Sequence, residues 1–156
     1  MTVLAAVGAA IMAGLLFAFS NFVMTSLSRL PAASGMEAMQ YINVDIVNPV
    51  FLVVFVGTSA LSLIILIAAV TTPPVPPRTW LVLAAGLYLL GVIGVTAVFN
   101  IPLNNSIANL PAAAADTAWP AYVQVWLRWN HVRSFAAVCS VACYAISAYQ
   151  LGRTRL

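Results

Sequence analysis

Residues 49–70 read PVFLVVFVGTSALSLIILIAAV, an apolar stretch without a single charged residue. As an α-helix, a stretch of this length measures about 33 Å, which is enough to cross the hydrocarbon core of a bilayer. It lacks the alternation of apolar and polar residues that is typical of strands in a membrane barrel. The stretch therefore predicts a membrane-spanning helix.

Three further segments have the same character and cover residues 3–24, 80–99 and 132–149. Over the whole chain 63% of the residues are apolar, 6% are charged and the mean hydropathy is +1.04. Soluble domains carry about 25% charged residues. A length of 156 residues leaves room for one domain. We predict a single all-α domain over residues 1–156, an integral membrane four-helix bundle in contact with the lipid bilayer.

The connection between the first two spans predicts a short interfacial helix. Ser34 and Glu37 form a capping-box pattern, and apolar residues at helical spacing follow them. We expect this helix to end near Val47. Asn48 and Pro49 then suit the N-cap and the first position of the next helix.

The other two connections differ from each other. Residues 71–78 form a tight proline-rich turn without chemically useful side chains. After the third span, Pro102 is expected to stop the helix, and Asp116 is expected to cap the next one. The first turn of that helix tolerates Pro120. Because residues 117–150 contain no helix breaker besides Pro120, they predict an extended fourth helix that begins outside the bilayer.

The arginines indicate the orientation of the bundle. The side of the N-terminus holds Arg78, Arg153 and Arg155, whereas the other side holds Arg29, Arg128, all three acids and Arg133, which lies at the boundary of the fourth span. By a small margin, the positive-inside rule favours both termini in the cytoplasm. We expect the membrane to be the plasma (inner) membrane. A net charge of +3 is too small and too scattered for a nucleic-acid interface.

Polar residues gather at the end of the bundle opposite the proline turn. All the asparagines lie in or beside this half: Asn21, Asn43, Asn48, Asn100, Asn104, Asn105, Asn109 and Asn130. This distribution predicts a polar chamber at the outer end. Three asparagines also have structural explanations, because Asn21 could make an interhelical hydrogen bond, Asn48 a helix cap and Asn100 a helix stop.

His131 and Arg133 stand at the start of the fourth span. An arginine this close to an apolar run must extend to the interface, pair with an acid such as Asp45, or bind an anion. Asp45 and Asn48 lie about one turn apart and can point to the same place. A base, a cation and several amides at a membrane-embedded opening suit the stabilisation of an enolate or phenolate.

Several blocks of this sequence agree in order and spacing with one known family. They are residues 17–24 (FAFSNFVM), 38–43 (AMQYIN), 48–51 (NPVF), 55–58 (FVGT), 94–105 (GVTAVFNIPLNN) and 126–133 (WLRWNHVR). The chain resembles the anthrone oxygenase-like family of membrane proteins. The resemblance implies oxidation of an apolar anthrone-like substrate by dioxygen, without an established organic cofactor.

On this hypothesis His131 is the general base, and Asp45 either orients His131 or pairs with Arg133. Arg133 holds the substrate oxyanion together with the amides of Asn104, Asn105 and Asn130. Rings of the substrate stack on Phe99, Trp126 and Trp129. The other expected substrate-binding residues are Asn21, Asn43, Asn48 and Asn100.

Other functions stay open at this point. The chain could be a non-enzymatic membrane protein that binds a lipid, a quinone or haem, or an assembly subunit. Gly86, Gly91 and Gly94 would allow close packing between spans or between copies in a homo-oligomer. We predict no cofactor, although haem or a metal could bind through His131. One histidine and no acid-rich spacing exclude a histidine-dominated di-metal site.

Overall fold

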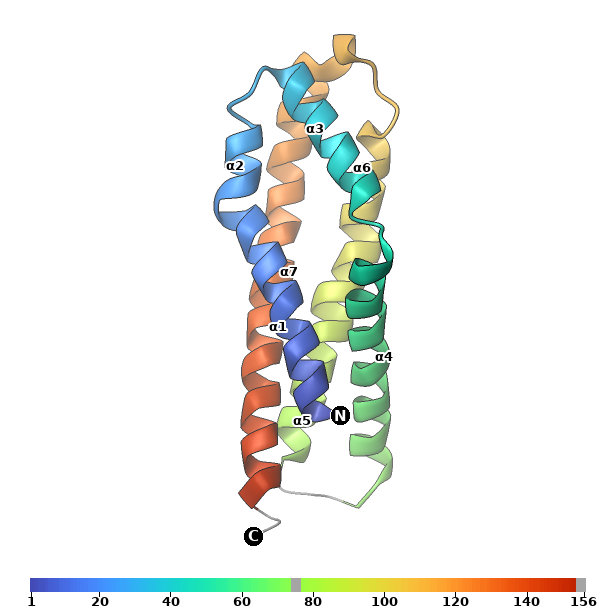
Figure 1. Cartoon of the computed structure of the whole chain (residues 1–156), viewed down its shortest axis with the longest axis vertical. Helices are drawn as coiled ribbons and strands as arrows, with labels where there is room; N and C mark the ends of the chain where they lie inside the picture. Colours follow the sequence, from blue (N-terminus) through green and yellow to red (C-terminus); the bar gives the residue numbers. More distant parts are fainter. Residues whose placement is uncertain (74–76, 154–156) are drawn as a thin grey trace.

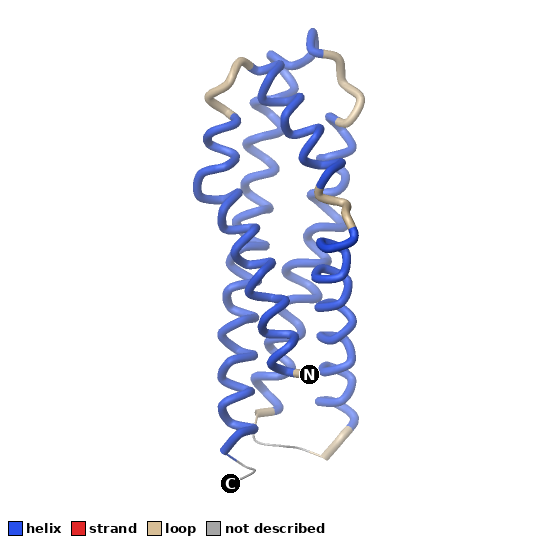
Figure 2. Tube along the Cα trace, in the orientation of Figure 1, coloured by secondary structure: helices blue, strands red, loops and turns tan. Residues whose placement is uncertain are grey.

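The computed structural model describes residues 1–73 and 77–153 (Figure 1). The described residues form helices joined by short loops and contain no strand (Figure 2). Four helical segments are long and apolar enough to cross a membrane: Thr2–Leu27, Pro49–Thr71, Arg78–Ile107 and Ala112–Arg153. The predicted all-α membrane bundle is confirmed. Residues 74–76 of the proline turn, and Arg155, lie outside the described residues.

The first span is continuous and is followed by a crossing helix. It consists of α1 (Thr2–Ala18), a π-helical turn η1 (Phe19–Val23) and α2 (Met24–Leu27). The next helix, α3 (Ala32–Asp45), crosses the upper part of the molecule in Figure 1 and leads towards α4 (Pro49–Thr71). The interfacial helix is therefore present where the sequence predicts it.

Its start, however, corrects the predicted capping box. The N-cap of α3 is Pro31, which offers no side-chain cap, and Ser34 and Glu37 already lie inside the helix. The predicted cap of α4 is present: Asn48 Oδ1 accepts a hydrogen bond from the Phe51 amide at 3.0 Å. Pro49 takes the first helical position, where its missing N–H leaves no intrahelical bond unmade.

The third span does not stop at Pro102, which corrects another prediction. It runs through α5 (Arg78–Gly86), the π-helical segments η2 (Leu87–Gly94) and η3 (Thr96–Asn100), and α6 (Ile101–Ile107). Pro102 lies in the first positions of α6, directly after η3. Local π-helical adjustment is one way in which a membrane helix accommodates a proline, because it changes which carbonyls need a donor.

The fourth span has the predicted extended form. A short 3₁₀ turn, η4 (Ala112–Ala114), leads into α7 (Ala115–Arg153), a helix of 39 residues with Pro120 inside it. Asp116 does not cap this helix but lies in its first turn, where a carboxylate still favours the positive end of the helix dipole. Figure 1 shows that α7 runs the length of the bundle. It packs against α1, α5 and α3.

Two clusters of buried side chains hold the molecule together. The first fills the bundle and includes the small residues Ala5, Ala9 and Ala137, which let α1 and α7 approach closely. The second fixes α3 over the upper half of α7 and consists of Met24, Met36, Met39, Ile107, Ala115, Trp119, Tyr122 and Trp126. The second cluster therefore holds α3 in place above the bundle.

Gly35 allows α3 to pack closely against Leu27 and Trp119, and its replacement should lower stability. A Cβ at Gly35 would lie 2.7 Å from the Leu27 carbonyl oxygen and 2.8 Å from Trp119 Nε1. Gly35→Ala should therefore lower the free energy of unfolding by about 1–3 kcal/mol, because the overpacked helix must shift. Gly57→Ala is the control, since its Cβ would meet nothing within 4 Å. Equal melting temperatures for the two variants in the same detergent would contradict this packing.

Candidate functional site

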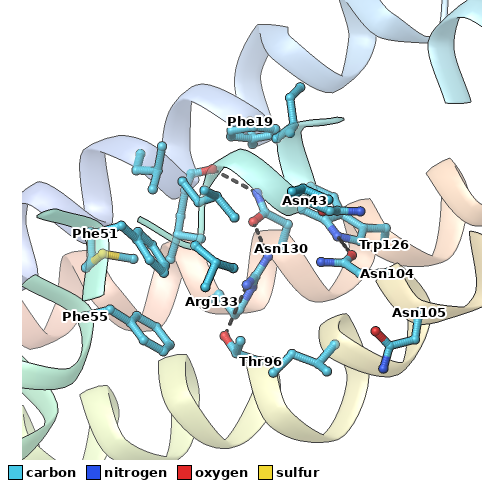
Figure 3. A pocket seen from close by; sticks show the side chains of 18 of the residues that line it. Phe19, Asn43, Phe51, Phe55, Thr96, Asn104, Asn105, Trp126, Asn130 and Arg133 are labelled. Carbon is cyan, nitrogen blue, oxygen red and sulfur yellow. Dashed lines mark hydrogen bonds between the residues drawn. The ribbon is translucent and has the colours of Figure 1, made fainter. Parts of the chain in front are cut away.

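A cavity of about 780 Å³ lies between α1, α3, α4, the third span and α7 (Figure 3). Its size is that of pockets that hold drug-sized ligands. The walls combine apolar side chains with a few polar groups, and the apolar side chains include Met12, Leu15, Phe19, Phe51, Phe55 and Trp126. Such a cavity suits a mostly apolar molecule of this size.

The phenylalanines of α4 and the asparagines of α6 lie at different ends of this cavity. Figure 3 shows Phe51 and Phe55 at one end and Asn104 and Asn105 at the other, with Arg133 between them. A ligand bound here would therefore meet two phenylalanine rings at one end and two amides at the other, with a cation in the middle.

Arg133 is the most unusual residue of the cavity. Only 7% of its surface is exposed, although it carries a full charge in a membrane-spanning helix. Its Nη1 donates to Thr96 Oγ1 at 3.1 Å and its Nη2 donates to Asn130 Oδ1 at 2.8 Å. The guanidinium also lies over the Trp126 ring, 5.3 Å from the ring centroid. These contacts are to neutral groups, so they orient the cation without neutralising it.

Asn130 holds Arg133 in this position. It is fully buried and lies one turn before Arg133 on α7. Its Nδ2 donates to the Leu16 carbonyl and to Ser20 Oγ, both at 2.8 Å. With both amide protons bound to the first span, its Oδ1 is left facing Arg133. Asn130 is thus a positioning residue that links α1, η1 and the cation.

Asn104 organises the polar end of the cavity. Its Oδ1 accepts hydrogen bonds from the Tyr122 hydroxyl and from Trp126 Nε1, each at 2.9 Å. Because the oxygen is used in this way, the Asn104 amide nitrogen is the group oriented for other partners. The Asn43 Nδ2 is buried beside the cavity without a hydrogen-bond partner in the described part of the chain.

The acids do not neutralise Arg133. Glu37, Asp45 and Asp116 are all exposed, and the described residues include no ion pair with Arg133. Glu37 borders the cavity, whereas Asp45 does not line it. The predicted pairing of Asp45 with Arg133 is therefore not present. A buried cation without an anionic partner is costly, so the site favours a ligand that supplies negative charge.

The sequence profile described as anthrone oxygenase matches residues 50–143. The chain belongs to the anthrone oxygenase family. No curated protein and no solved structure matches the chain. The matched region contains every cavity residue contributed by α4, the third span and α7, including Arg133. The cavity walls from α1 and α3 lie outside it.

His131 lies apart from this cavity, contrary to the predicted convergence with Arg133. Its side chain is exposed and borders a second, apolar groove between α5, η2 and α7, beside Leu83, Leu90 and Phe135. The physical reason is helical geometry. Successive residues of an α-helix are about 100° apart, so His131 points away from the face that carries Asn130 and Arg133.

The other predicted site residues divide into two groups. Six line the cavity: Asn43, Asn104, Asn105, Trp126, Asn130 and Arg133. Asn21 and Asn48 are exposed and do not line it, and Asn48 serves as the α4 cap. Asn100 is buried beside α6 but also does not line it.

The two aromatic residues Phe99 and Trp129 stack on each other instead of facing the cavity. Their ring centroids are 3.5 Å apart and their planes differ by 7°. Sequence reasoning missed Thr96, Phe51 and Phe55, which do line the cavity. A signal was available for Thr96. A hydroxyl in an apolar span is a natural hydrogen-bond partner for a buried arginine on a neighbouring helix.

Proposed function

We propose that this protein is a membrane oxygenase that oxidises an anthrone-like substrate with dioxygen, and that Arg133 stabilises the substrate anion. The observation that carries the proposal is a buried guanidinium that meets only neutral partners among the described residues, at the centre of a largely apolar cavity. Family membership supports the same reaction class. Arg133 is the residue to which we assign the central role.

The chemistry of an anthrone fits such a cavity. An anthrone is flat and apolar, and loss of one proton from its ring methylene gives an anion whose charge lies largely on the carbonyl oxygen. A guanidinium has five N–H donors, and two of those of Arg133 have protein partners. The remaining donors can bind the oxygen. A preorganised cation in an apolar site stabilises developing negative charge strongly.

The reaction is balanced without any further reactant. The released proton passes to water at the polar end of the cavity, which Glu37 and Asn105 border. The electron-rich anion transfers an electron to dioxygen, and the two radicals combine at the ring carbon to form a carbon–oxygen bond. The peroxide then takes up the proton, its O–O bond breaks and the second ring hydrogen is lost. Anthrone and dioxygen thereby give anthraquinone and water.

Purified protein in lipid nanodiscs tests this proposal. We expect anthrone-dependent oxygen uptake, with one anthraquinone formed per dioxygen consumed, at a rate well above that of empty nanodiscs. Absence of turnover above the empty-disc rate would contradict the proposed activity. An absorption spectrum of the same preparation tests the alternative in which His131 holds haem, since a Soret band lost in His131→Ala would support that alternative.

The proposal makes a specific prediction for His131. Because its side chain borders the outer groove and not the cavity, His131→Ala should keep oxygen uptake within about twofold of the wild type, as expected for an exposed position away from the reacting atoms. The measurement is initial anthrone-dependent oxygen uptake at matched protein concentration. If His131→Ala loses activity while its melting temperature is unchanged, His131 would be the general base, as the sequence predicts.

A further inference from the structure

We propose that the substrate reaches the cavity sideways from the bilayer, through a lateral mouth between the end of α3 and the start of α4. This inference rests on the proposed function, because it concerns the route to the same site. The lateral mouth consists of Val44, Val47, Leu52 and Val56. All four residues line the cavity, and their exposed fractions are 72%, 62%, 40% and 56%. They therefore form both the cavity wall and the molecular surface.

The α4 side of the lateral mouth belongs to a helix long and apolar enough to span a membrane. Leu52 and Val56 lie in the first two turns of α4, a helix of 23 residues that is apolar enough to cross a membrane. Val53 lies between them, is 74% exposed, and does not line the cavity, so it marks the neighbouring lipid-facing surface. Exposed valines and leucines beside a spanning helix are stable against acyl chains and unfavourable against water.

A second border of the cavity, formed by residues of α3 and α6, has a different character. Glu37 and Tyr41 lie one to two turns before Val44 on α3, and both are exposed and line the cavity. Asn105 borders the cavity from α6 and is also exposed. The polar border can admit water and release protons. An apolar neutral molecule dissolved in the bilayer instead meets the lateral mouth first.

The position of Arg133 explains why a neutral molecule would be admitted and an ion retained. A neutral anthrone partitions into acyl chains and can pass the four aliphatic side chains at no electrostatic cost. Once inside, it reaches the cation held by Asn130 and Thr96 and can ionise there. The lateral mouth thus separates delivery of the neutral substrate from formation of its anion.

Paired valine substitutions test the route. Val56→Trp fills the lateral mouth, whereas Val53→Trp places the same side chain on the adjacent lipid-facing surface of the same helix. In nanodiscs, we would follow binding of fluorescent 1,8-dihydroxyanthraquinone by stopped flow. Val56→Trp should slow its association by about tenfold or more, because access is then limited by rearrangement of the mouth, while Val53→Trp stays near the wild-type rate. Val47→Trp and Val50→Trp form a second pair of the same design.

The outcomes separate this inference from the proposed function. Equal association rates in Val56→Trp and Val53→Trp would overturn the lateral mouth, even if the wild type oxidises anthrone. Selective slowing in Val56→Trp and Val47→Trp would support it, even if anthrone is not oxidised and the proposed function fails. No binding of the probe to the wild type would overturn it as well.

Discussion

Arg133→Gln should lower kcat/KM for anthrone oxidation by about 100-fold or more, the size of effect seen when a preorganised donor to a developing oxyanion is removed. The variant keeps a polar side chain that can still bond to Asn130 Oδ1 or Thr96 Oγ1, the two present partners of Arg133. It removes the positive charge. The expected loss is therefore one of catalysis and not of folding, and initial rates of oxygen uptake measure it.

The matched control is Arg128→Gln, which removes the same charge from an exposed position on the same helix. We expect its activity and melting temperature to equal those of the wild type, since isolated surface charges contribute little. If both arginine variants lose activity equally, the activity depends on the net charge of the protein and not on the position of Arg133 in the cavity. If Arg133→Gln is fully active, the role assigned to Arg133 is wrong.

Asn130→Asp should inactivate the protein to a similar extent, about 100-fold, by supplying the missing counter-charge. The Asn130 oxygen lies 2.8 Å from Arg133 Nη2, so a carboxylate there would form a buried, charge-assisted pair. A substrate anion would then meet an arginine whose charge is already neutralised, and the new carboxylate would repel it. The measurement is kcat/KM together with binding of the anthraquinone probe, which should also weaken.

The substitution also removes the Nδ2 donor to the Leu16 carbonyl and Ser20 Oγ, so thermal melting must be recorded with the kinetics. Asn109→Asp is the control for added negative charge, because Asn109 is exposed in the loop after α6. It should have no effect. A folded Asn130→Asp variant with wild-type kinetics would show that the charge of the cavity does not govern the reaction.

The architecture was largely predictable from the sequence. Only long apolar helices or closed barrels can cross a bilayer. Residues 49–70 and the three other spans are recognisable as such helices by their length and apolar composition. The extended α7 followed from the lack of a helix breaker after Pro120, which lies near the start of the helix. The failures concern local hydrogen bonding: Pro102 is accommodated by the π-helical η3, and Pro31 starts α3 before the expected capping box.

The candidate site was predictable only in part, because proximity in sequence is not a shared helix face. Trp126, Asn130 and Arg133 are spaced four and three apart, so they fall on one face of α7 and reach the cavity together. His131 adjoins them in sequence but faces the outer groove. The roles of Phe51 and Phe55 depend on how α4 packs beside α1, which no single segment reveals.

The most direct test of the central claim is the ionisation of bound anthrone in the absence of oxygen. Anthrone and its anion differ in absorption, so an anaerobic pH titration of protein-bound anthrone gives the midpoint of its ionisation. We predict a midpoint about one to three pH units lower on the wild type and on Arg128→Gln than on Arg133→Gln, as expected for an anion beside a cation. The same midpoint on all three proteins would contradict stabilisation of the substrate anion by Arg133.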